Sequence, residues 1–288
     1  MTRQGLIVCA ALAVFSPFAL VCSAAAAEKP SGDGARMLMV TQSAGYRHGS
    51  VTRQDAKLSP AERAMTELGI SSGLYRADCT QDCAGITQEM LDGYEIVFFY
   101  TTGNLPFKEE VRDYLLCDWV KKKGHGFIGA HSAADTYNNY EPYWEMIGGT
   151  FDGHPWNFGE TVTIKVHDHQ HPASKPLGEE LTIQDEIYKF KNWQPEKVRV
   201  LASLDFEKTQ HREPYHVPIL WVKNYGDGKV MHMSLGHNEH VWANPKFLDS
   251  IQGGVEWILG KQEGDATPNP ELSKAEDEMA KKIHAGTK

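Results

Sequence analysis

A single histidine, His131, follows the short apolar run at residues 127–130 and stands among glycine, alanine and serine. Small residues on both sides permit a sharp turn from a strand into a helix, which in other α/β enzymes exposes a reactive side chain at the carboxyl edge of a sheet. An imidazole in that position can bind a metal ion or transfer a proton. The alternative is a buried structural histidine beneath a tight turn.

Three more histidines stand in predicted loops and are candidates for the same site. His48 follows the first predicted strand, His154 lies in an Asp-Gly-His-Pro segment, and His237 follows the last predicted strand. Functional side chains gather on loops that a rigid sheet holds in place. We therefore expect these histidines to line one cleft, with His131, His154 and His237 as candidate ligands of a divalent metal ion.

A carboxylate pair, Asp185 and Glu186, stands beside Tyr188. One carboxylate with several imidazoles forms a set that can bind a divalent transition metal or act as acid and base. The residues alone also fit a solvated strand end, which is the more common place for acidic side chains. Trp156, next to His154, is a candidate platform for stacking on a sugar ring, although most tryptophans of this chain are core candidates.

These loops need a scaffold, and the first half of the chain predicts alternating strands and helices. Ser59, Pro60 and Glu62 form the sequence pattern of a capping box at the start of a helix. Such alternation indicates a mostly parallel sheet with helices on both faces, and ligands of these sheets bind where the strands end. The predicted strands are residues 36–41, 74–76, 94–100 and 127–130, and the predicted helices are residues 61–68 and 107–123.

The second half is richer in predicted strands, and we expect it to extend the sheet with some antiparallel pairing. Asn244 and Pro245 open a last helix that ends near Gly260. The tail at residues 261–288 is charged and contains proline, so we expect a mobile end with a short helix near residues 274–283. The predicted strands are residues 160–166, 198–204, 217–223 and 229–235.

The amino-terminal residues have the features of a targeting segment. Residues 1–27 contain one arginine, no acid, an apolar run and then a run of alanines, which is typical of a secretory signal peptide. We expect residues 28–35 to be a linker and residues 36–260 to form one domain. The predicted location is the periplasm or the outside of the cell. No later segment is apolar enough to cross a membrane.

The charge of the chain limits the classes of molecule that it can be expected to bind. The chain has a formal net charge of -9 and no long basic run, which argues against nucleic acid and anionic membrane surfaces as partners. We expect no nucleotide cofactor, and a homo-oligomer is an open alternative to a monomer.

Cys79 and Cys83 are close enough in sequence for a small-loop disulfide, with a zinc site as the weaker alternative. Cys117 lies in a helical pattern and is predicted to be a buried thiol.

Five short motifs of this chain, taken in order, resemble the trehalose utilisation (ThuA-like) family. The similarity spans about residues 36–260 and implies a class I glutamine amidotransferase-like fold, a flavodoxin-like sheet in which amidotransferases carry a cysteine where this chain has His131. An imidazole cannot replace the thiolate that forms the acyl intermediate, so we expect no glutamine hydrolysis. The motifs are residues 44–48, 126–132, 148–155, 185–188 and 234–237.

The resemblance implies a role in the catabolism of disaccharides or glycosides, in particular of sugars oxidised at carbon 3. A ketone at carbon 3 acidifies the proton on carbon 2, so a base and an electrophile can expel the group at carbon 1 by elimination. Two alternatives stay open, a metal-dependent hydrolase with another substrate and a non-catalytic sugar-binding protein. The predicted residues are His131, His154, Asp185 and Glu186 for catalysis, His131, His154 and His237 for metal, and Tyr46, His48, Trp156, Tyr188 and His237 for a small carbohydrate substrate.

Overall fold

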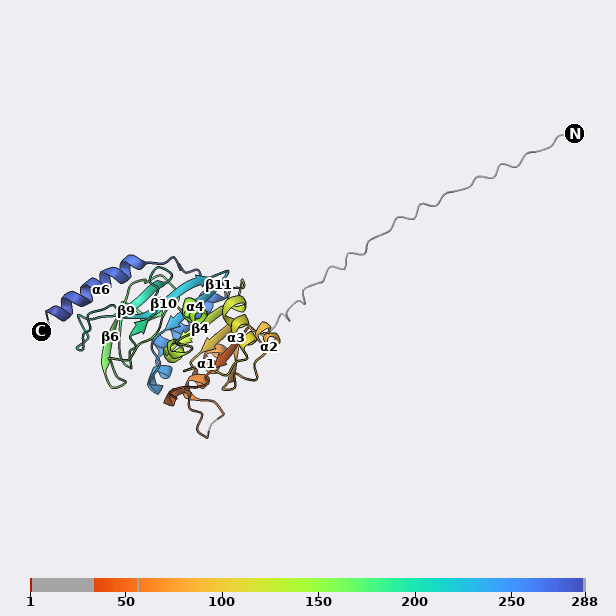
Figure 1. The fold of residues 1–288 in the computed structure, drawn as a ribbon, viewed down its shortest axis with the longest axis horizontal. Helices are drawn as coiled ribbons and strands as arrows, with labels where there is room; N and C mark the ends of the chain where they lie inside the picture. The colour runs from red at the N-terminus through yellow and green to blue at the C-terminus, as the bar shows by residue number, and fades with distance from the viewer. Residues whose placement is uncertain (2–33, 56, 287–288) are drawn as a thin grey trace. The chain divides into compact units, whose positions relative to one another are not determined.

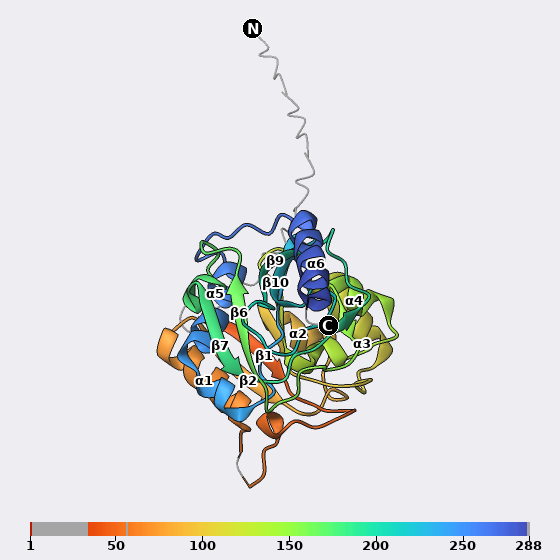
Figure 2. The same cartoon turned by 90° about the vertical axis from the view of Figure 1, so that its left-hand side faces the viewer.

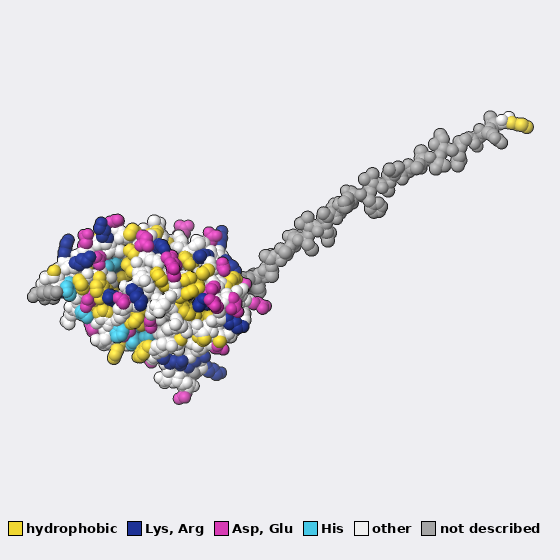
Figure 3. All heavy atoms as spheres, in the orientation of Figure 1, with side chains coloured by type: hydrophobic (Ala, Val, Ile, Leu, Met, Phe, Trp, Pro, Cys, Tyr) yellow, Lys and Arg dark blue, Asp and Glu magenta, His cyan; other side chains and the backbone are white. Residues whose placement is uncertain are grey.

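The computed structural model describes residues 1, 34–55 and 57–286. The predicted signal peptide and most of the predicted linker lie outside the described residues, so the signal peptide and the export that it implies stay predictions. Within the described part of the chain, no helix has both the length and the apolar character that a membrane crossing requires. On the face drawn in Figure 3, acidic and basic side chains are interspersed.

A nine-stranded mixed sheet forms the centre of the fold, in the order β2-β1-β3-β4-β11-β10-β9-β6-β7. Its parallel half contains β1 (Ala35–Val40), β2 (Tyr75–Thr80), β3 (Ile96–Phe99), β4 (Gly126–Ala130) and β11 (Gly228–Met233). Its antiparallel extension contains β10 (Pro218–Tyr225), β9 (Arg199–Leu204), β6 (Thr161–Val166) and β7 (Glu180–Gln184). A separate pair joins β5 (Thr150–Phe151) to β8 (Phe190–Lys191). The predicted α/β sheet with a β-rich second half is confirmed.

Alternating side chains of the central strands fill two cores, one on each face of the sheet. On β1, Met37 and Met39 enter one core while Leu38 and Val40 enter the other. Figure 2 shows α1 (Pro60–Ser72) and α5 (Pro245–Ile258) on one side of the sheet, and α3 (Glu109–Asp113) and α4 (Glu141–Ile147) on the other. Because both faces are covered, the parallel strands are apolar on both sides.

Two helical segments differ from the sequence expectation. The helix predicted at residues 107–123 is α3 followed by a wider π-helical segment at Tyr114–Trp119. The tail contains a longer helix than the one predicted at residues 274–283, because α6 (Pro270–Ala285) spans more residues and lies against the sheet (Figure 1). The Asn269 side chain binds both backbone groups of Val200 on β9, at 2.8 and 2.9 Å, and thereby fixes the start of α6. The remaining helix, α2, spans Gln88–Asp92.

The three described cysteines are free thiols, which corrects the predicted disulfide. Cys79 packs against the core beneath α1, whereas Cys83 is buried in the core on the opposite face. The sheet therefore separates the two sulfur atoms, and a two-thiol zinc site is excluded for the same reason. Cys117 is half-buried rather than fully buried.

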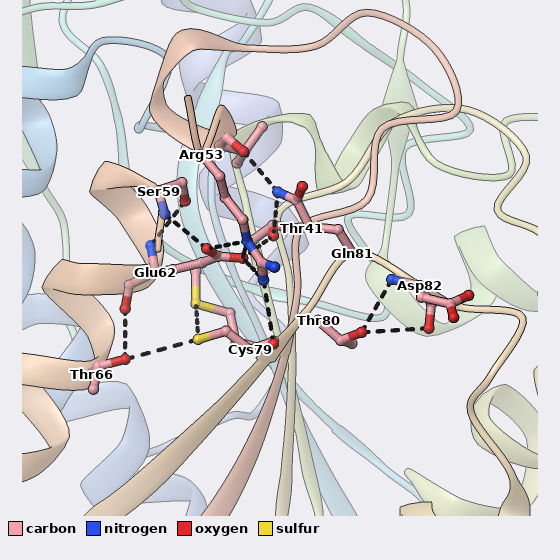
Figure 4. A network of polar contacts seen from close by, with 11 residues as sticks. Thr41, Arg53, Ser59, Glu62, Thr66, Cys79, Thr80, Gln81 and Asp82 are labelled. Carbon is pink, nitrogen blue, oxygen red and sulfur yellow. Dashed lines mark hydrogen bonds and ion pairs between the residues drawn. The ribbon is translucent and has the colours of Figure 1, made fainter. Parts of the chain in front are cut away.

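A buried carboxylate at the start of α1 anchors the loop that carries Tyr46 and His48. Glu62 accepts hydrogen bonds from the Ser59 backbone N–H at 2.8 Å and from the Thr41 hydroxyl at 2.6 Å. The Arg53 guanidinium lies 2.8 Å from the same carboxylate, as Figure 4 shows. These partners stand at both ends of the loop and inside it, so one side chain ties Thr41, Arg53 and Ser59 together.

Replacing Glu62 by glutamine is expected to lower the free energy of unfolding by about 2 kcal/mol at pH 7, because it leaves Arg53 without its charge partner. Burial opposes ionisation of Glu62, but its hydrogen bonds to Arg53 and Thr41 hold its pKa below the ordinary value of 4.5. A depressed folded-state pKa stabilises the fold fully above pH 4.5, and this contribution is lost as the pH falls through that lower value. Urea unfolding at pH 7 and pH 3 should therefore show a smaller difference between wild type and Glu62→Gln at the lower pH.

The matched control is Glu67→Gln, since Glu67 is exposed on the same helix. Its unfolding free energy should stay within about 0.5 kcal/mol of wild type. Equal losses for the two substitutions would contradict the anchoring role of Glu62.

Candidate functional site

Loops after three parallel strands and one antiparallel strand bring four predicted residues together. His48 follows β1, His131 follows β4 and His237 follows β11, while Glu186 lies after β7. Each side chain offers one ligand atom, and these atoms all lie within 4.8 Å of one another. We call His48, His131, Glu186 and His237 the four-residue cluster. Its position at the carboxyl ends of parallel strands is where such sheets bind ligands.

The backbone at His131 adopts a left-handed conformation, with φ of +43°. This conformation is uncommon for a residue with a Cβ, and it turns the chain sharply out of β4. The Nδ1 atom lies 3.0 Å from the carbonyl oxygen of Ser234, so the carbonyl accepts the Nδ1 proton. That contact leaves the Nε2 lone pair free, and Nε2 lies 3.5 Å from a carboxylate oxygen of Glu186.

The buried nitrogens of the cluster fit a transition metal. In the described part of the chain, His48 Nδ1 and His131 Nε2 are buried and have no hydrogen-bond partner. Burial, with His131 and His237 nearby, lowers the pKa of His48 to about 2, so its ring is neutral at physiological pH. Neutral imidazoles with one carboxylate suit divalent zinc, iron, copper, nickel or manganese, whereas magnesium and calcium prefer all-oxygen sets.

Glu186 connects the cluster to His154. One oxygen lies 3.1 Å from His237 Nδ1, and the other lies 3.4 Å from His154 Nδ1. Burial opposes ionisation, but the nearby His131 and His237 imidazoles outweigh it and keep the pKa of Glu186 below its ordinary value. The His154 side chain is 52% exposed and lies outside the cluster. Of the predicted metal ligands, the cluster contains His131 and His237 but not His154, and it adds His48 and Glu186. The metal ligands themselves stay a prediction.

Asp185 points away from its neighbour Glu186 and binds the loop that carries His237. Its buried carboxylate accepts hydrogen bonds from the backbone N–H groups of Gly236 at 2.7 Å and Asn238 at 3.0 Å. These two groups flank His237 in sequence, so Asp185 sets the position of that imidazole. The geometry gives Asp185 a positioning role in place of the predicted catalytic one.

A pocket of about 430 Å³ opens over the cluster. Tyr188 belongs to its wall, and the Tyr188 ring centroid lies 4.3 Å from that of His131. Trp156 does not, because its side chain is fully buried in the core and its indole N–H donates to the carbonyl of His211. The sugar platform predicted at Trp156 is therefore wrong in this structure. The pocket is lined by Tyr46, His48, Asp135, Phe151, His154, Asn157, Phe158, Glu186, Tyr188 and His237.

Four lining residues were missed by the sequence analysis: Asp135, Phe151, Asn157 and Phe158. Asp135 ends the 3₁₀ turn that begins at His131, and this spacing was an available signal. Its carboxylate accepts a hydrogen bond from the Asn138 side chain at 2.6 Å, and burial raises the pKa of Asp135. The other three surround His154 in sequence.

Comparison with known proteins identifies the family. The family model ThuA, described as trehalose utilisation, matches residues 36–258. The chain belongs to the ThuA family. No curated protein matches it.

Solved structures of ThuA-like proteins share the fold. A putative ThuA-like protein from Bacteroides uniformis is 20% identical, with a TM-score of 0.64 over 86% of this chain and 98% of its own. Another from Parabacteroides merdae is 13% identical, with a TM-score of 0.61 over 83% of this chain and 99% of its own. The cytoplasmic protein STM1381 from Salmonella typhimurium is 16% identical, with a TM-score of 0.53 over 78% of this chain and 97% of its own. The flavodoxin-like, amidotransferase-like fold expected from the resemblance is confirmed.

Replacing Asp185 by alanine is expected to free the loop at residues 236–238, because two buried N–H groups lose their acceptor. The unfolding free energy should fall by about 2–4 kcal/mol. Hydrogen exchange followed by mass spectrometry should show faster exchange of this loop than in wild type. Asp78→Ala, which removes an exposed partner of Arg36, is the control and should leave exchange of the loop unchanged. Unchanged protection in Asp185→Ala would refute the positioning role.

Proposed function

We propose that this ThuA-family protein cleaves glycosides whose sugar carries a ketone at carbon 3, with a divalent transition metal held by the four-residue cluster. The observation that carries the proposal is the convergence of four ligand atoms, within 4.8 Å of one another, beneath a 430 Å³ pocket. The family description, trehalose utilisation, supports a sugar as substrate. A pocket of this volume lies in the lower part of the range of roughly 300–1,000 Å³ for small-molecule sites.

The metal would act as a Lewis acid on the ketone oxygen. The cluster residues supply the neutral imidazoles and the carboxylate that such an ion requires, since His48 is held neutral and His131 presents its free Nε2. Glu186 has a second function, because its outer oxygen faces His154 and orients that ring. With Nδ1 of His154 directed at Glu186, Nε2 is left for the substrate.

His154 is the proposed base. It removes the proton from carbon 2, the electron pair of that bond forms the double bond between carbons 1 and 2, and the bond from carbon 1 to the leaving oxygen breaks. The leaving oxygen takes up a proton, and addition of water at carbon 1 would complete a net hydrolysis. His154 combines the required features, since it lines the pocket, is half-exposed and is oriented by a carboxylate.

Asp135 is the second proton-transfer candidate. It lines the same pocket, and burial raises its pKa, which favours the protonated form that can donate to a leaving oxygen. Asn138 binds its carboxylate and fixes its orientation. The pocket thus offers an imidazole and a carboxyl group in different environments, as acid–base pairs require.

Metal content is the first test. Purified wild-type protein analysed by inductively coupled plasma mass spectrometry should contain close to one divalent transition-metal ion per chain. His131→Ala and Glu186→Ala should lose most of it, because each removes a ligand atom from the cluster. His154→Ala, which lies outside the cluster, should retain the metal and serves as the matched control. Metal loss in His154→Ala with retention in His131→Ala would contradict the assignment.

Turnover is the second test. Wild type should cleave a 3-keto-glucoside and leave the unoxidised glucoside intact, because only the ketone acidifies the proton on carbon 2. His154→Gln should lower kcat by roughly 10²- to 10⁴-fold with its metal content unchanged. Cleavage of the unoxidised glucoside would favour a metal-dependent hydrolase. Binding of both sugars without turnover would favour a sugar-binding protein.

A further inference from the structure

Two exposed aromatic side chains stand at the mouth of the pocket. Tyr46 is 67% exposed and Phe158 is 59% exposed, and they are the only aromatic residues among the exposed large hydrophobic side chains of the described residues. Both line the pocket, although they come from loops more than a hundred residues apart in the chain. Exposed apolar side chains that gather at a concave site mark a binding surface.

Each aromatic ring lies beside a different histidine of the cluster. The Tyr46 ring meets His48 edge-on at 4.9 Å between centroids, and the Phe158 ring lies parallel to His237 at 5.8 Å. The rings of His48 and His237 are 4.8 Å apart. A ligand bound at the cluster therefore passes these two rings on its way to solvent.

Hydrogen bonds hold the backbone beneath both rings. The Thr102 hydroxyl donates to the carbonyl oxygen of Tyr46 at 2.8 Å and accepts from Gly45 N–H at 3.1 Å. The Asn238 side chain donates to the carbonyl oxygen of Phe158 at 2.8 Å. The loops are thus held in place before any ligand arrives, which lowers the entropic cost of binding.

Burial separates an inner part of the pocket from an outer part. Tyr188 and Glu186 are buried at the inner end, where the cluster lies, whereas Tyr46 and Phe158 face solvent at the outer end. The reacting sugar must reach the cluster, so the part of a glycoside that lies beyond carbon 1 extends toward the two aromatic rings. The flat, C–H-rich face of a sugar ring or a planar aglycone stacks well on such side chains.

We propose that Tyr46 and Phe158 form a leaving-group subsite that binds a ring, so that the substrates are glycosides with a cyclic leaving group rather than a small alkyl one. This inference rests on the proposed function, because it names the class of substrate that the same site takes. It assigns Tyr46 a specific role and introduces Phe158 as the stacking residue.

The test compares kcat/KM for phenyl 3-keto-glucoside with kcat/KM for methyl 3-keto-glucoside. Wild type should favour the phenyl compound, and Phe158→Ala and Tyr46→Ala should each lower the ratio by about three- to tenfold. The ratio is unaffected by a general loss of activity, because such a loss applies to both substrates. Phe158→Tyr keeps a ring at this position and should preserve the ratio.

Ile70→Ala is the matched control, since Ile70 is 74% exposed on α1 and does not line the pocket. It should leave the ratio unchanged. A ratio that is the same in wild type and both alanine variants would overturn the subsite while the proposed function stands. A shift in oligomeric state on gel filtration, without a change in the ratio, would instead assign the rings to contacts between copies of the chain.

Equilibrium binding distinguishes a failure of the proposed function from a failure of the leaving-group subsite. If wild type turns over neither 3-keto-glucoside, calorimetry with unoxidised phenyl and methyl glucoside measures the same preference without chemistry. Tighter binding of the phenyl compound, lost in Phe158→Ala, would support the subsite even then. Equal affinities for the two glucosides would overturn it.

Discussion

The contact between His131 Nδ1 and the carbonyl oxygen of Ser234 depends on the register of two parallel strands. Ala130 on β4 pairs with Met233 on β11, so His131 and Ser234 are the next residues along each strand. The imidazole thus binds a backbone group at the point where the ladder ends. Since Ser234 also begins the turn that leads to His237, the pairing of β4 with β11 positions two imidazoles of the cluster together. The close packing requires Gly129, where a Cβ atom would lie only 2.7 Å from His232 Nδ1.

The adjacent carboxylates Asp185 and Glu186 have different surroundings, and these surroundings give them different roles. Both are buried, and two neighbouring buried charges are costly unless each is compensated. Backbone N–H groups compensate Asp185, and burial nevertheless raises its pKa. Imidazoles compensate Glu186, whose pKa is lowered. Asp185 therefore holds the loop that carries His237 in place, while Glu186 faces the pocket and is available as a ligand.

Sequence patterns predicted the sheet well because buried parallel strands are continuous apolar runs between turn signals. They also predicted that loops carrying His48, His131 and His237 meet at one edge, since that follows from parallel strands. What the patterns did not contain was the direction of each side chain within its loop. Trp156 forms a bridge with Ile187 and turns into the core, while Phe158, two residues later, faces solvent. The direction of the side chain also distinguishes two of the histidines. His48 points inward and is 2% exposed, whereas the His154 side chain lies at the rim of the pocket and is 52% exposed. Cys79 and Cys83 were separated by the sheet itself, which no spacing rule reveals.

The side chains of the pocket differ from those of a cysteine or serine nucleophile site. Among the described residues that line it there is no serine, threonine or cysteine. Ser132, next to the turn where amidotransferases carry their cysteine, is fully buried. The His131 ring has one nitrogen bound to a carbonyl and directs the other at Glu186, so it is not placed to activate a nucleophile. The groups that face the pocket include imidazoles, carboxyl groups and aromatic rings, and the first two can transfer protons. The same turn in the same fold thus presents an imidazole where amidotransferases carry a cysteine thiol, and it points one ring nitrogen toward Glu186.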